Sequence, residues 1–596
     1  MGQRKQAGTP NSGIQKTWRI IPHDSGLVGK LESMAGVSPV VAQLLAARGV
    51  HNPDDVKRFL DCKLSSLREP DDLPGVIEAS ARVASAVREK RKIVVYGDYD
   101  ADGMTSTAIL YRCLKLLGAD VSYYVPNRLE EGYGLNVEAL QTLAKRGANL
   151  VVTVDCGIAS LSEAIFAKEL GLELIITDHH EMAEALPEAA AIVHPRLPGT
   201  HYPFAGLCGA GVAFKLAWAI CQRMSEAKKV SESMRDYLLA ALGLAALGTV
   251  ADVVPLLDEN RVLVRHGLTS LKERPGLGLS ALLKLTGLES KPYLTSEDIG
   301  FSLAPRLNAA GRLGQAQLGV ELLTTDSPER ARALADYIHG LNTTRESLER
   351  SIQIAAAKQI KEECDVENDP AFVLAGRGWH PGVIGIVAGR LAEKYHRPVA
   401  MIALDQAGIK PGVGSARSAA GINLHRALGD CSETLVAFGG HAAAAGFKVE
   451  DAQLDAFRAQ FLDAVAKEAA NSTQIAEYVI DAESPISLLS LEVVRQLDRL
   501  GPFGQANPRP MLFAGAVSLA EPPKKMGGGE RHLSVRFTQH RATLRGVAFG
   551  HGERCEELAA LTGPLDIVYR PIINEFRGKS SVEIQLVDFR PAETST

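Results

Sequence analysis

The sequence predicts an α/β protein with two α/β lobes joined by a helical linker, followed by a small β-barrel. Three patterns predict this architecture. Short apolar runs alternate with helical patterns in two separate regions, a long charged helical segment separates them at 327–363, and short alternating runs fill the last part of the chain. With 596 residues, the chain is too long for a single hydrophobic core at roughly 100–200 residues per domain.

Residues 1–75 read as a polar tail followed by short helices. The first lobe, at 76–265, is predicted from buried parallel strands, each followed by a helical pattern. These strands are KIVVY at 92–96, LVVTV at 150–154 and LELIIT at 172–177, with helices expected at 105–117, from about 161, and after the third strand. Strands that alternate with helices predict a parallel, doubly wound sheet.

The rest of the chain continues this division. Residues 266–363 are expected to form a helical segment and linker. A second α/β lobe at 364–470 is predicted from the strands PAFVLAG and RPVAMIAL and the helix PGVIGIVAGRLAEKY between them. The runs LSVRF, ATLRGVAF, LDIVYR and SVEIQLVDF predict a β-barrel over 471–596.

Composition favours an ordinary soluble protein, with 46% hydrophobic and 23% charged residues and a net charge of −5. Eight cysteines without a CxxC pair predict neither a zinc site nor a disulfide framework, and fit a reducing cytoplasm. The N-terminus lacks the apolar core of a signal peptide, and the apolar run 237–251 is shorter than the ~20 residues that span a bilayer. We therefore expect a cytoplasmic monomer without a membrane segment.

Three carboxylates, Asp98, Asp100 and Asp102, follow the first strand within GDYDADG. In an extended backbone all three would point to one face and repel one another unless cations neutralise them. A solvated turn and a calcium EF-hand are the alternatives. Against an EF-hand, Ile109 stands where that loop places its ligand Glu, and an apolar strand precedes the motif.

Further acidic and imidazole groups follow the other strands. Asp155 follows LVVTV, and Asp178-His179-His180 follows LELIIT. Because ligands bind at the carboxyl ends of parallel strands, we expect these groups to meet at one edge. Asp252 is a charge among apolar residues, so it is either a metal ligand or the partner of an arginine such as Arg261 or Arg265.

Carboxylate and imidazole ligands without thiolates suit Mn²⁺ or Mg²⁺ better than structural zinc. The number of carboxylates suggests two ions, commonly about 3.5–4 Å apart in sites for phosphoryl chemistry. The residues alone therefore predict a two-metal site that suits phosphoryl chemistry.

GDYDADG, DCG, DHH and GTVADVVPL, in this order, resemble the motifs of the DHH phosphoesterase superfamily. YPFAGLCGAGVAFKL, APRLNAAGRLG, WHPGVIGIVAGRL, GSARS, FGGHAAAAGF and GPFGQANPRP narrow the resemblance to RecJ-type single-strand-specific DNA exonucleases, over residues 30–590. The resemblance implies Mn²⁺- or Mg²⁺-dependent 5′-to-3′ release of nucleotides in DNA repair and recombination. It also implies a DHH lobe, a DHH-associated lobe and an OB-like barrel.

By motif, the resemblance implies six metal-site residues: Asp98, Asp100, Asp102, Asp155, His179 and Asp252. It places His180 at the scissile phosphate or leaving group, with Asp155 and Asp252 also taking part in catalysis. Two departures from the usual pattern, His194-Pro195 in place of Asn-Pro and Ala506 in place of Gly, lie outside the metal motifs.

The substrate contacts are expected in the small-residue segments GSARS and GGHAAAAG of the second lobe, which we expect to be loops that approach phosphates closely. With the resemblance, Ser415, Arg417 and His441 are assigned to the DNA end or scissile phosphate, because backbone N–H groups and a guanidinium suit phosphate. The alternative is tight packing of small residues. Arg306, Asn308 and Arg312, in a segment that reads as a loop, are further candidate phosphate contacts.

The barrel resembles an OB fold, which often holds single strands. Its candidate groove has Phe503 and Phe537 for stacking, and a solvated charged face with core Phe residues is the alternative. The candidate cations are Lys524, Lys525, Arg531, Arg536, Arg541 and Arg545.

Other functions stay open at this stage. They are a DHH enzyme for short oligonucleotides or cyclic dinucleotides, a pyrophosphatase, and a non-catalytic single-strand DNA-binding protein. The barrel favours long single strands over the first two, and the filled metal motifs argue against the third. The resemblance further implies single-strand binding protein and a RecQ-type helicase as partners.

Overall fold

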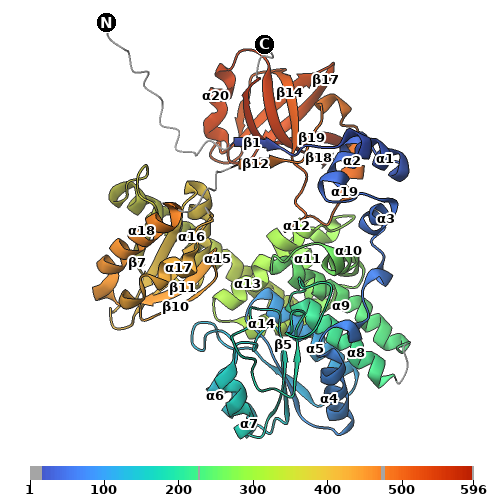
Figure 1. Cartoon of the computed structure of the whole chain (residues 1–596), viewed down its shortest axis with the longest axis vertical. Coiled ribbons are helices and arrows are strands. Elements are labelled where there is room, and N and C mark those ends of the chain that lie inside the picture. The colour runs from blue at the N-terminus through green and yellow to red at the C-terminus, as the bar shows by residue number, and fades with distance from the viewer. Residues whose placement is uncertain (1–16, 226–228, 420, 471–476, 577, 593–596) are drawn as a thin grey trace. The chain divides into compact units, whose positions relative to one another are not determined.

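The computed structural model describes residues 17–225, 229–419, 421–470, 477–576 and 578–592 (Figure 1). It divides into two compact units. One holds residues 340–478 with the start of the chain, and the other holds residues 19–339 and 479–596. The boundaries fall within a two-stranded sheet of β1 (Thr17–Ile20) and β12 (Glu477–Ile480) and within the long helix α15 (Pro328–Glu363).

A five-stranded, fully parallel sheet organises the first lobe, in the order β3-β2-β4-β5-β6. The strands are β2 (Ile93–Tyr96), β3 (Val121–Tyr124), β4 (Leu150–Thr153), β5 (Glu173–Thr177) and β6 (Ala191–Val193). The central strands β2 and β4 are buried on both faces, which explains their continuous apolar sequence. The predicted doubly wound parallel sheet is therefore confirmed.

Helices cover both faces of this sheet (Figure 1). On one face, α6 (Val137–Lys145) and α7 (Leu161–Glu169) pack Leu140, Leu143 and Ala164 against Val94, Val151 and Ile176. On the other face lie α4 (Val76–Arg88), α5 (Ala101–Leu116) and α8 (Gly209–Met224). Both layers leave the carboxyl ends of the strands open for function.

The predicted helical segment follows. Within residues 266–363 its main helices are α11 (Gly276–Leu285), α13 (Ala304–Arg312), α14 (Ala316–Thr324) and α15. Helix α9 (Glu232–Ala251) and the first half of α10 (Asp258–Glu273) lie before it, in the range predicted for the first lobe. By length and apolar composition alone α9 could cross a membrane, and it is longer than the run 237–251. Core helices meet the same criterion, and half of its apolar stretch is buried here, where α9 packs against α5, α8 and α10.

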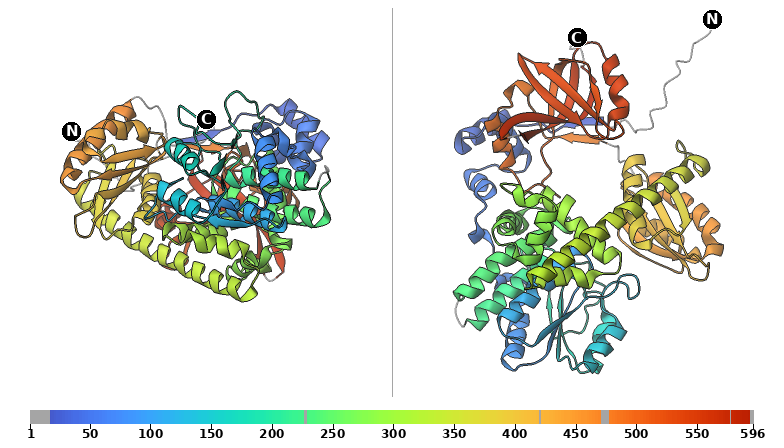
Figure 2. Two further views of the ribbon diagram at one scale, coloured as in Figure 1. Left: turned by 90° about the horizontal axis from the view of Figure 1, so that it is seen from below. Right: turned by 180° about the vertical axis from the view of Figure 1, so that it is seen from behind.

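The C-terminal sheet forms the predicted barrel, in the order β13-β14-β18-β19-β17-β16-β15, and a further pairing of β14 with β16 closes it. Its strands are β13 (Ala482–Glu483), β14 (Leu512–Leu519), β15 (Lys524–Met526), β16 (His532–Gln539), β17 (Ala542–Ala548), β18 (Leu565–Phe576) and β19 (Lys579–Pro591). Helices α1 (Ser25–Ala35), α2 (Pro39–Ala47) and α3 (Pro53–Asp61) share one apolar core with it, for example through Leu44 and Tyr569 (Figure 2).

The other unit contains a five-stranded mixed sheet, β10-β11-β9-β8-β7, in which only β7 and β8 are parallel. Its strands are β7 (Phe372–Arg377), β8 (Val399–Leu404), β9 (Gly412–Arg417), β10 (Ala437–Gly440) and β11 (Ala444–Val449). Helices α16 (Pro381–Tyr395), α17 (Leu424–Gly429) and α18 (Leu454–Ala470) pack on it. A second α/β lobe is thus present, with α16 where the sequence predicts it.

Four local predictions are wrong. Helix α5 begins at Ala101 instead of 105, because Asp100 caps it. Residues 181–190 form no helix, and 304–312, expected as a loop, are helix α13. The GSARS segment, expected as a loop, is strand β9, because it pairs with β8 and β11 on both sides.

Candidate metal centre

Most of the predicted acidic and imidazole groups lie directly after the carboxyl ends of three neighbouring parallel strands. Asp98 follows β2, Asp155 follows β4, and Asp178, His179 and His180 follow β5. Asp252 arrives from a different element as the C-terminal cap of α9. The predicted meeting of these groups at one edge of the sheet is therefore what the structure has.

These side chains form groups whose ligand atoms all lie within 4.8 Å of one another. One group is Asp102, His179 and Asp252, a second is Asp98, Asp100 and Asp155, and a third is Asp155, His179 and His180. The first two share no residue, so each could hold one cation.

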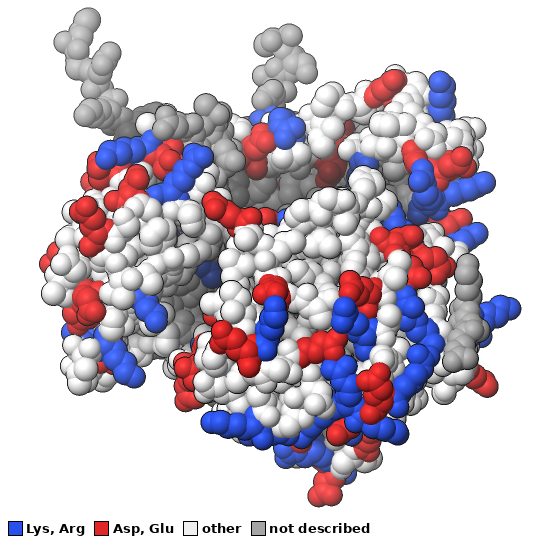
Figure 3. Space-filling view, turned by 60° about the horizontal axis from the view of Figure 1, so that its bottom comes forward, with Lys and Arg blue, Asp and Glu red and all other residues white. Residues whose placement is uncertain are grey.

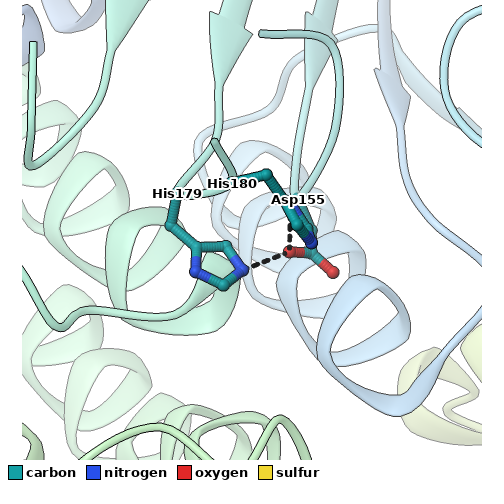
Figure 4. A group of neighbouring side chains, drawn as sticks. All are labelled: Asp155, His179 and His180. Atoms are coloured by element: carbon teal, nitrogen blue, oxygen red, sulfur yellow. Dashed lines mark ion pairs between the residues drawn. The ribbon is translucent and has the colours of Figure 1, made fainter. Parts of the chain in front are cut away.

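His179 of one group and Asp155 of the other are neighbours, and Figure 4 shows the rings of His179 and His180 next to the carboxylate of Asp155. The His179 Nε2 atom lies 3.1 Å from Asp155 Oδ1, 3.6 Å from Asp252 Oδ2 and 3.8 Å from Asp102 Oδ2. Asp155 belongs to the group with Asp98 and Asp100, and its Oδ1 also approaches His179 of the other group, which suits a residue between two ions.

Three buried atoms of this cluster lack a hydrogen-bond partner: Asp98 Oδ1, Asp155 Oδ1 and His179 Nε2. A buried polar atom without a partner is costly, so its presence calls for an explanation. All three are electron-pair donors from the residues that the motifs predict as ligands. Hard oxygen atoms with one imidazole suit Mn²⁺ or Mg²⁺, so the donor set fits these cations.

The pKa values of the carboxylates show that their negative charges are not neutralised within the protein. Burial and the neighbouring carboxylates raise the pKa of Asp155 and of Asp98 well above the usual range, of Asp102 to about 6 and of Asp252 to about 8. Burial lowers the pKa of His179 to about 3, which keeps its ring neutral as a ligand requires. Cations would relieve the carboxylate repulsion.

Asp100 and Asp102 are held by backbone N–H groups at the starts of two helices. Asp100 Oδ1 accepts from the N–H groups of Asp102 and Gly103. Asp102 accepts from those of Gly209 (2.7 Å) and Ala210 (2.9 Å) at the start of α8. The three carboxylates therefore do not share a face of an extended strand, as the spacing suggested, because the helix turns Asp102 toward a different group.

Two alternative interpretations of these motifs fail. Asp102 lies in an α-helix, so GDYDADG is not a calcium-binding EF-hand loop. Arg261 donates to the carbonyls of Phe59 and Leu500, and Arg265 to those of Arg499 and Gly501. Neither arginine is an ion-pair partner of Asp252, which instead joins the metal-site group.

Asp178 is a functional residue that the motif analysis did not assign. Its Oδ1 accepts from the His180 ring Nδ1 at 2.8 Å and from the backbone N–H groups of His179 and His180, while Oδ2 accepts from the N–H of Ile158. Burial acts to raise the pKa of Asp178, but the bond and charge of His180 hold it at about 2. Burial acts to lower the pKa of His180, and Asp178 raises it to about 9.

The surroundings of His180 fix its ring further. Tyr133 places its hydroxyl 3.0 Å from His180 Nδ1 and stacks edge-on against the ring. The main-chain carbonyl of His180 lies 2.9 Å from His194 Nε2. His194, one of the two departures from the family pattern, is thus buried behind the metal centre and supports the His-His turn.

Helix α13 supports the metal loop from the other side. Asn308 Oδ1 accepts from the N–H of Ala101 at 2.9 Å, and Gly311 packs against the carbonyl of Tyr99. Arg306 donates to His339 Nδ1 and to the carbonyl of Ser302, and Arg312 ends the helix, half-buried. Asn308 positions the loop, while phosphate contacts from the three residues stay a prediction.

In the other unit, Ser415 and Arg417 project from the same face of β9, two residues apart. Arg417 Nη1 donates to Ser415 Oγ at 2.9 Å and to the carbonyl of Ala416. Gly385 of α16 approaches this pair so closely that a Cβ there would lie 2.9 Å from both side chains. His441 stands exposed where β10 turns into β11, the strand that pairs Ala444 with Arg417.

The prediction of stacking aromatics in the barrel groove is wrong. Phe537 is fully buried and Phe503 is 9% exposed, because both point into apolar packing. Several of the predicted cations pair with carboxylates: Lys525 with Glu556, Arg536 with Glu521, and Arg545 with Glu583. The charged side chains of both signs are interspersed over the face shown in Figure 3.

Comparison with protein families gives three matches along the chain. The DHH family N-terminal domain matches residues 92–242, the DHHA1 domain residues 368–468, and the RecJ OB domain residues 480–588. The single-stranded-DNA-specific exonuclease RecJ of Escherichia coli is 36% identical over 581 residues, which cover 94% of this chain and 96% of that protein. The chain belongs to the RecJ family.

Other RecJ proteins agree with this assignment. The exonuclease of Bacillus subtilis is 36% identical over 578 residues, covering 97% of this chain and 71% of that protein. Among solved structures, RecJ of Thermus thermophilus in complex with Mn²⁺ is 33% identical, with a TM-score of 0.80, covering 97% of this chain and 80% of that one. The same protein in complex with Mg²⁺ has a TM-score of 0.75 and 32% identity, covering 97% of this chain and 79% of that one.

Proposed function

We propose that this RecJ-family protein is a metal-dependent exonuclease that removes nucleotides from the 5′ end of single-stranded DNA. One observation carries the proposal. Two separate groups of ligand atoms meet around Asp155 and His179, where three buried electron-pair donors have no hydrogen-bond partner. Two cations held there suit in-line displacement at a phosphodiester.

The ligands divide between two cations. Asp102, His179 and Asp252 would hold one Mn²⁺ or Mg²⁺, and Asp98, Asp100 and Asp155 the other. Asp155 Oδ1 also lies 3.1 Å from His179 of the first group. Bound ions of this kind supply an activated water and neutralise charge on the phosphate. The chain's own task is to hold the ligands at fixed positions, through the N–H groups that bind Asp100 and Asp102, and to keep His179 neutral through burial.

His180 is proposed to act on the substrate. Asp178 occupies its Nδ1, so only Nε2 is available to a phosphate or a leaving oxygen. Asp178 also favours the protonated ring, since it raises the pKa of His180 to about 9. A protonated His180 stabilises charge on the phosphate and can give its Nε2 proton to the departing oxygen of the released nucleotide.

The second unit is proposed to hold the strand end. Arg417, braced by Ser415, offers a planar fork that matches phosphate oxygens, and His441 adds a further donor nearby along the β9–β11 pair. A preference for a terminal 5′ phosphate would give the enzyme its polarity. Arg306 and Arg312 of α13 are proposed as further phosphate contacts.

The proposed setting is DNA repair and recombination in the cytoplasm, where single-stranded ends arise. Single-strand binding protein and a RecQ-type helicase would supply and present such strands, and we propose both as partners. An enzyme for short oligonucleotides or cyclic dinucleotides is not favoured, because the chain matches RecJ proteins over more than nine-tenths of its length, barrel included. A non-catalytic binding protein would not need the complete ligand set.

End-labelled substrates test the proposal. Single strands labelled at the 5′ or the 3′ end, as DNA and as RNA, are incubated with Mn²⁺, Mg²⁺ or EDTA. We expect release of labelled mononucleotide at the earliest times from 5′-labelled DNA only, in the presence of either metal. Early release from the 3′ label, cleavage within the strand, or equal activity in EDTA would overturn it.

A further inference from the structure

An aromatic side chain in the turn before helix α13 is almost fully exposed to solvent. Phe301 is 82% exposed, the largest exposed fraction of any large hydrophobic residue in the described part of the chain. A lone exposed apolar residue needs no explanation by itself. Phe301, however, lies in a π-helical turn, η4 (Ile299–Leu303). Such turns are rare in proteins, and those that occur are often at functional sites.

This turn is fixed on both sides of Phe301. Ile299 and Leu303 are fully buried, so the backbone between them is anchored while Phe301 points outward. Thr295 and Asp298 form a capping box that fixes the chain just before the turn. The aromatic ring is therefore presented from a rigid support, which lowers the entropy lost when it binds a partner.

The turn also lies next to the elements that carry the metal ligands. A Cβ at Gly300 would lie 3.8 Å from the side chain of Val250, two residues before Asp252. Helix α13 continues directly from the turn to Asn308, which bonds the N–H of Ala101 between Asp100 and Asp102. The turn that carries Phe301 therefore contacts the end of α9, which carries Asp252, and is continuous with α13, which contacts the loop that carries Asp100 and Asp102.

Other exposed side chains near these elements suit a nucleic acid strand. Val253, directly after Asp252, is 65% exposed, and Tyr337 of α15 is 50% exposed. Arg306 lies between them in the chain, bonded to His339 two residues beyond Tyr337. Proteins commonly hold single strands by stacking bases on aromatic rings and by contacts of phosphates with cations.

We propose that Phe301 stacks on an unpaired base of the DNA strand as the strand approaches the metal centre. The proposal rests on the function proposed above. An aromatic face accepts any base, so the contact is independent of sequence. In a duplex both faces of each internal base are covered by neighbouring pairs, so the same contact favours single strands.

A kinetic comparison of Phe301→Ala and Phe301→Trp tests the stacking. Alanine substitution at a base-stacking aromatic weakens binding by about 5- to 150-fold, so we expect KM for a long single strand to rise within this range in Phe301→Ala. We expect kcat to change little and Phe301→Trp to retain the wild-type KM. Ile165→Ala on α7, which also removes a half-exposed apolar side chain, is the control and should match wild type.

A strand with one abasic nucleotide, moved position by position from the 5′ end, locates the contact. At one position the wild-type KM should rise to that of Phe301→Ala, while the variant should be insensitive there. An unchanged KM in Phe301→Ala, a loss confined to kcat, or equal abasic profiles for both proteins would overturn the proposal. So would a change in sedimentation of Phe301→Ala, which would assign the ring to self-association. If the proposed function itself is wrong, wild type will instead be inactive on every strand.

Discussion

The hydrogen bond between Asp178 and His180 allows a test of whether His180 acts on the substrate while other residues bind the metal. The change is Asp178→Asn, which keeps the shape of the side chain and removes its charge. Asp178 belongs to none of the groups that could hold a cation, so its loss should leave metal binding intact. It should instead release the ring of His180, whose Nδ1 it holds at 2.8 Å.

The expected fall in kcat follows from the hydrogen bond that Asp178→Asn weakens. A hydrogen bond to a charged group contributes about 1.5–3 kcal/mol. Because about 1.4 kcal/mol is tenfold in rate, kcat should fall by roughly 10- to 150-fold. An amide can still accept from His179 and His180 through one oxygen, but its NH₂ group then faces the N–H of Ile158. This mismatch should lower the free energy of unfolding by about 1–3 kcal/mol.

The assay combines single-turnover cleavage of 5′-labelled single-stranded DNA with calorimetric titration of Mn²⁺. Asp326→Asn, in a side chain that is 92% exposed, serves as the matched control and should leave both quantities unchanged. In a His180→Ala background, Asp178→Asn should have little further effect on kcat. A loss of metal affinity as large as the loss of kcat, or fully multiplicative effects of the two substitutions, would refute the reasoning.

Three further predictions concern the neighbouring groups. His179→Ala should weaken Mn²⁺ binding and be partly rescued by high Mn²⁺, whereas His180→Ala should lower kcat with metal binding retained; identical Mn²⁺ affinities in calorimetry would contradict this. Folded Asp102 and Asp252 have pKa values of about 6 and 8 against an ordinary value near 3.8, so the metal-free folded state binds more protons than the unfolded state over this range. Urea unfolding in EDTA should therefore show stability falling as pH rises from about 4 to 8, and saturating Mn²⁺ should remove that slope; a slope that Mn²⁺ leaves unchanged would count against the cluster. Arg417→Ala should lower activity chiefly on 5′-phosphorylated ends, and an equal loss on 5′-hydroxyl ends would exclude its role in end recognition.

The sequence could predict the metal centre because it depends on strand ends. Parallel neighbours finish at one edge, so Asp155 and His179 could be placed together from apolar runs alone. Asp102 lies at the metal centre as predicted, but a capped helix and not an extended strand orients its side chain. Capping was visible in Asp100 three residues before Gly103, and could have given the correct start of α5.

Other features depend on tertiary packing that no local pattern shows. The role of Asp178 could not be predicted, because it depends on the turn after β5 that brings its carboxylate against the His180 ring. Period-two alternation places Phe537 on one face of a strand, but only barrel closure decides that this face is the interior. The π-helical turn at Phe301 has no sequence signature of its own, because it results from the packing of Ile299 and Leu303 on both sides.

Asp155→Ala tests the central claim most directly. Gly209 lies so close to this carboxylate that a Cβ there would be 2.5 Å from Oδ1, so the position is built around Asp155. The measurement is Mn²⁺-dependent release of nucleotide from 5′-labelled single-stranded DNA by the variant, with circular dichroism as the check on folding. We predict a folded protein without detectable release. Removal of the carboxylate that belongs to one group and lies 3.1 Å from His179 of the other disrupts the cation sites while relieving the repulsion among the carboxylates. Turnover near that of wild type by the folded variant would contradict the account.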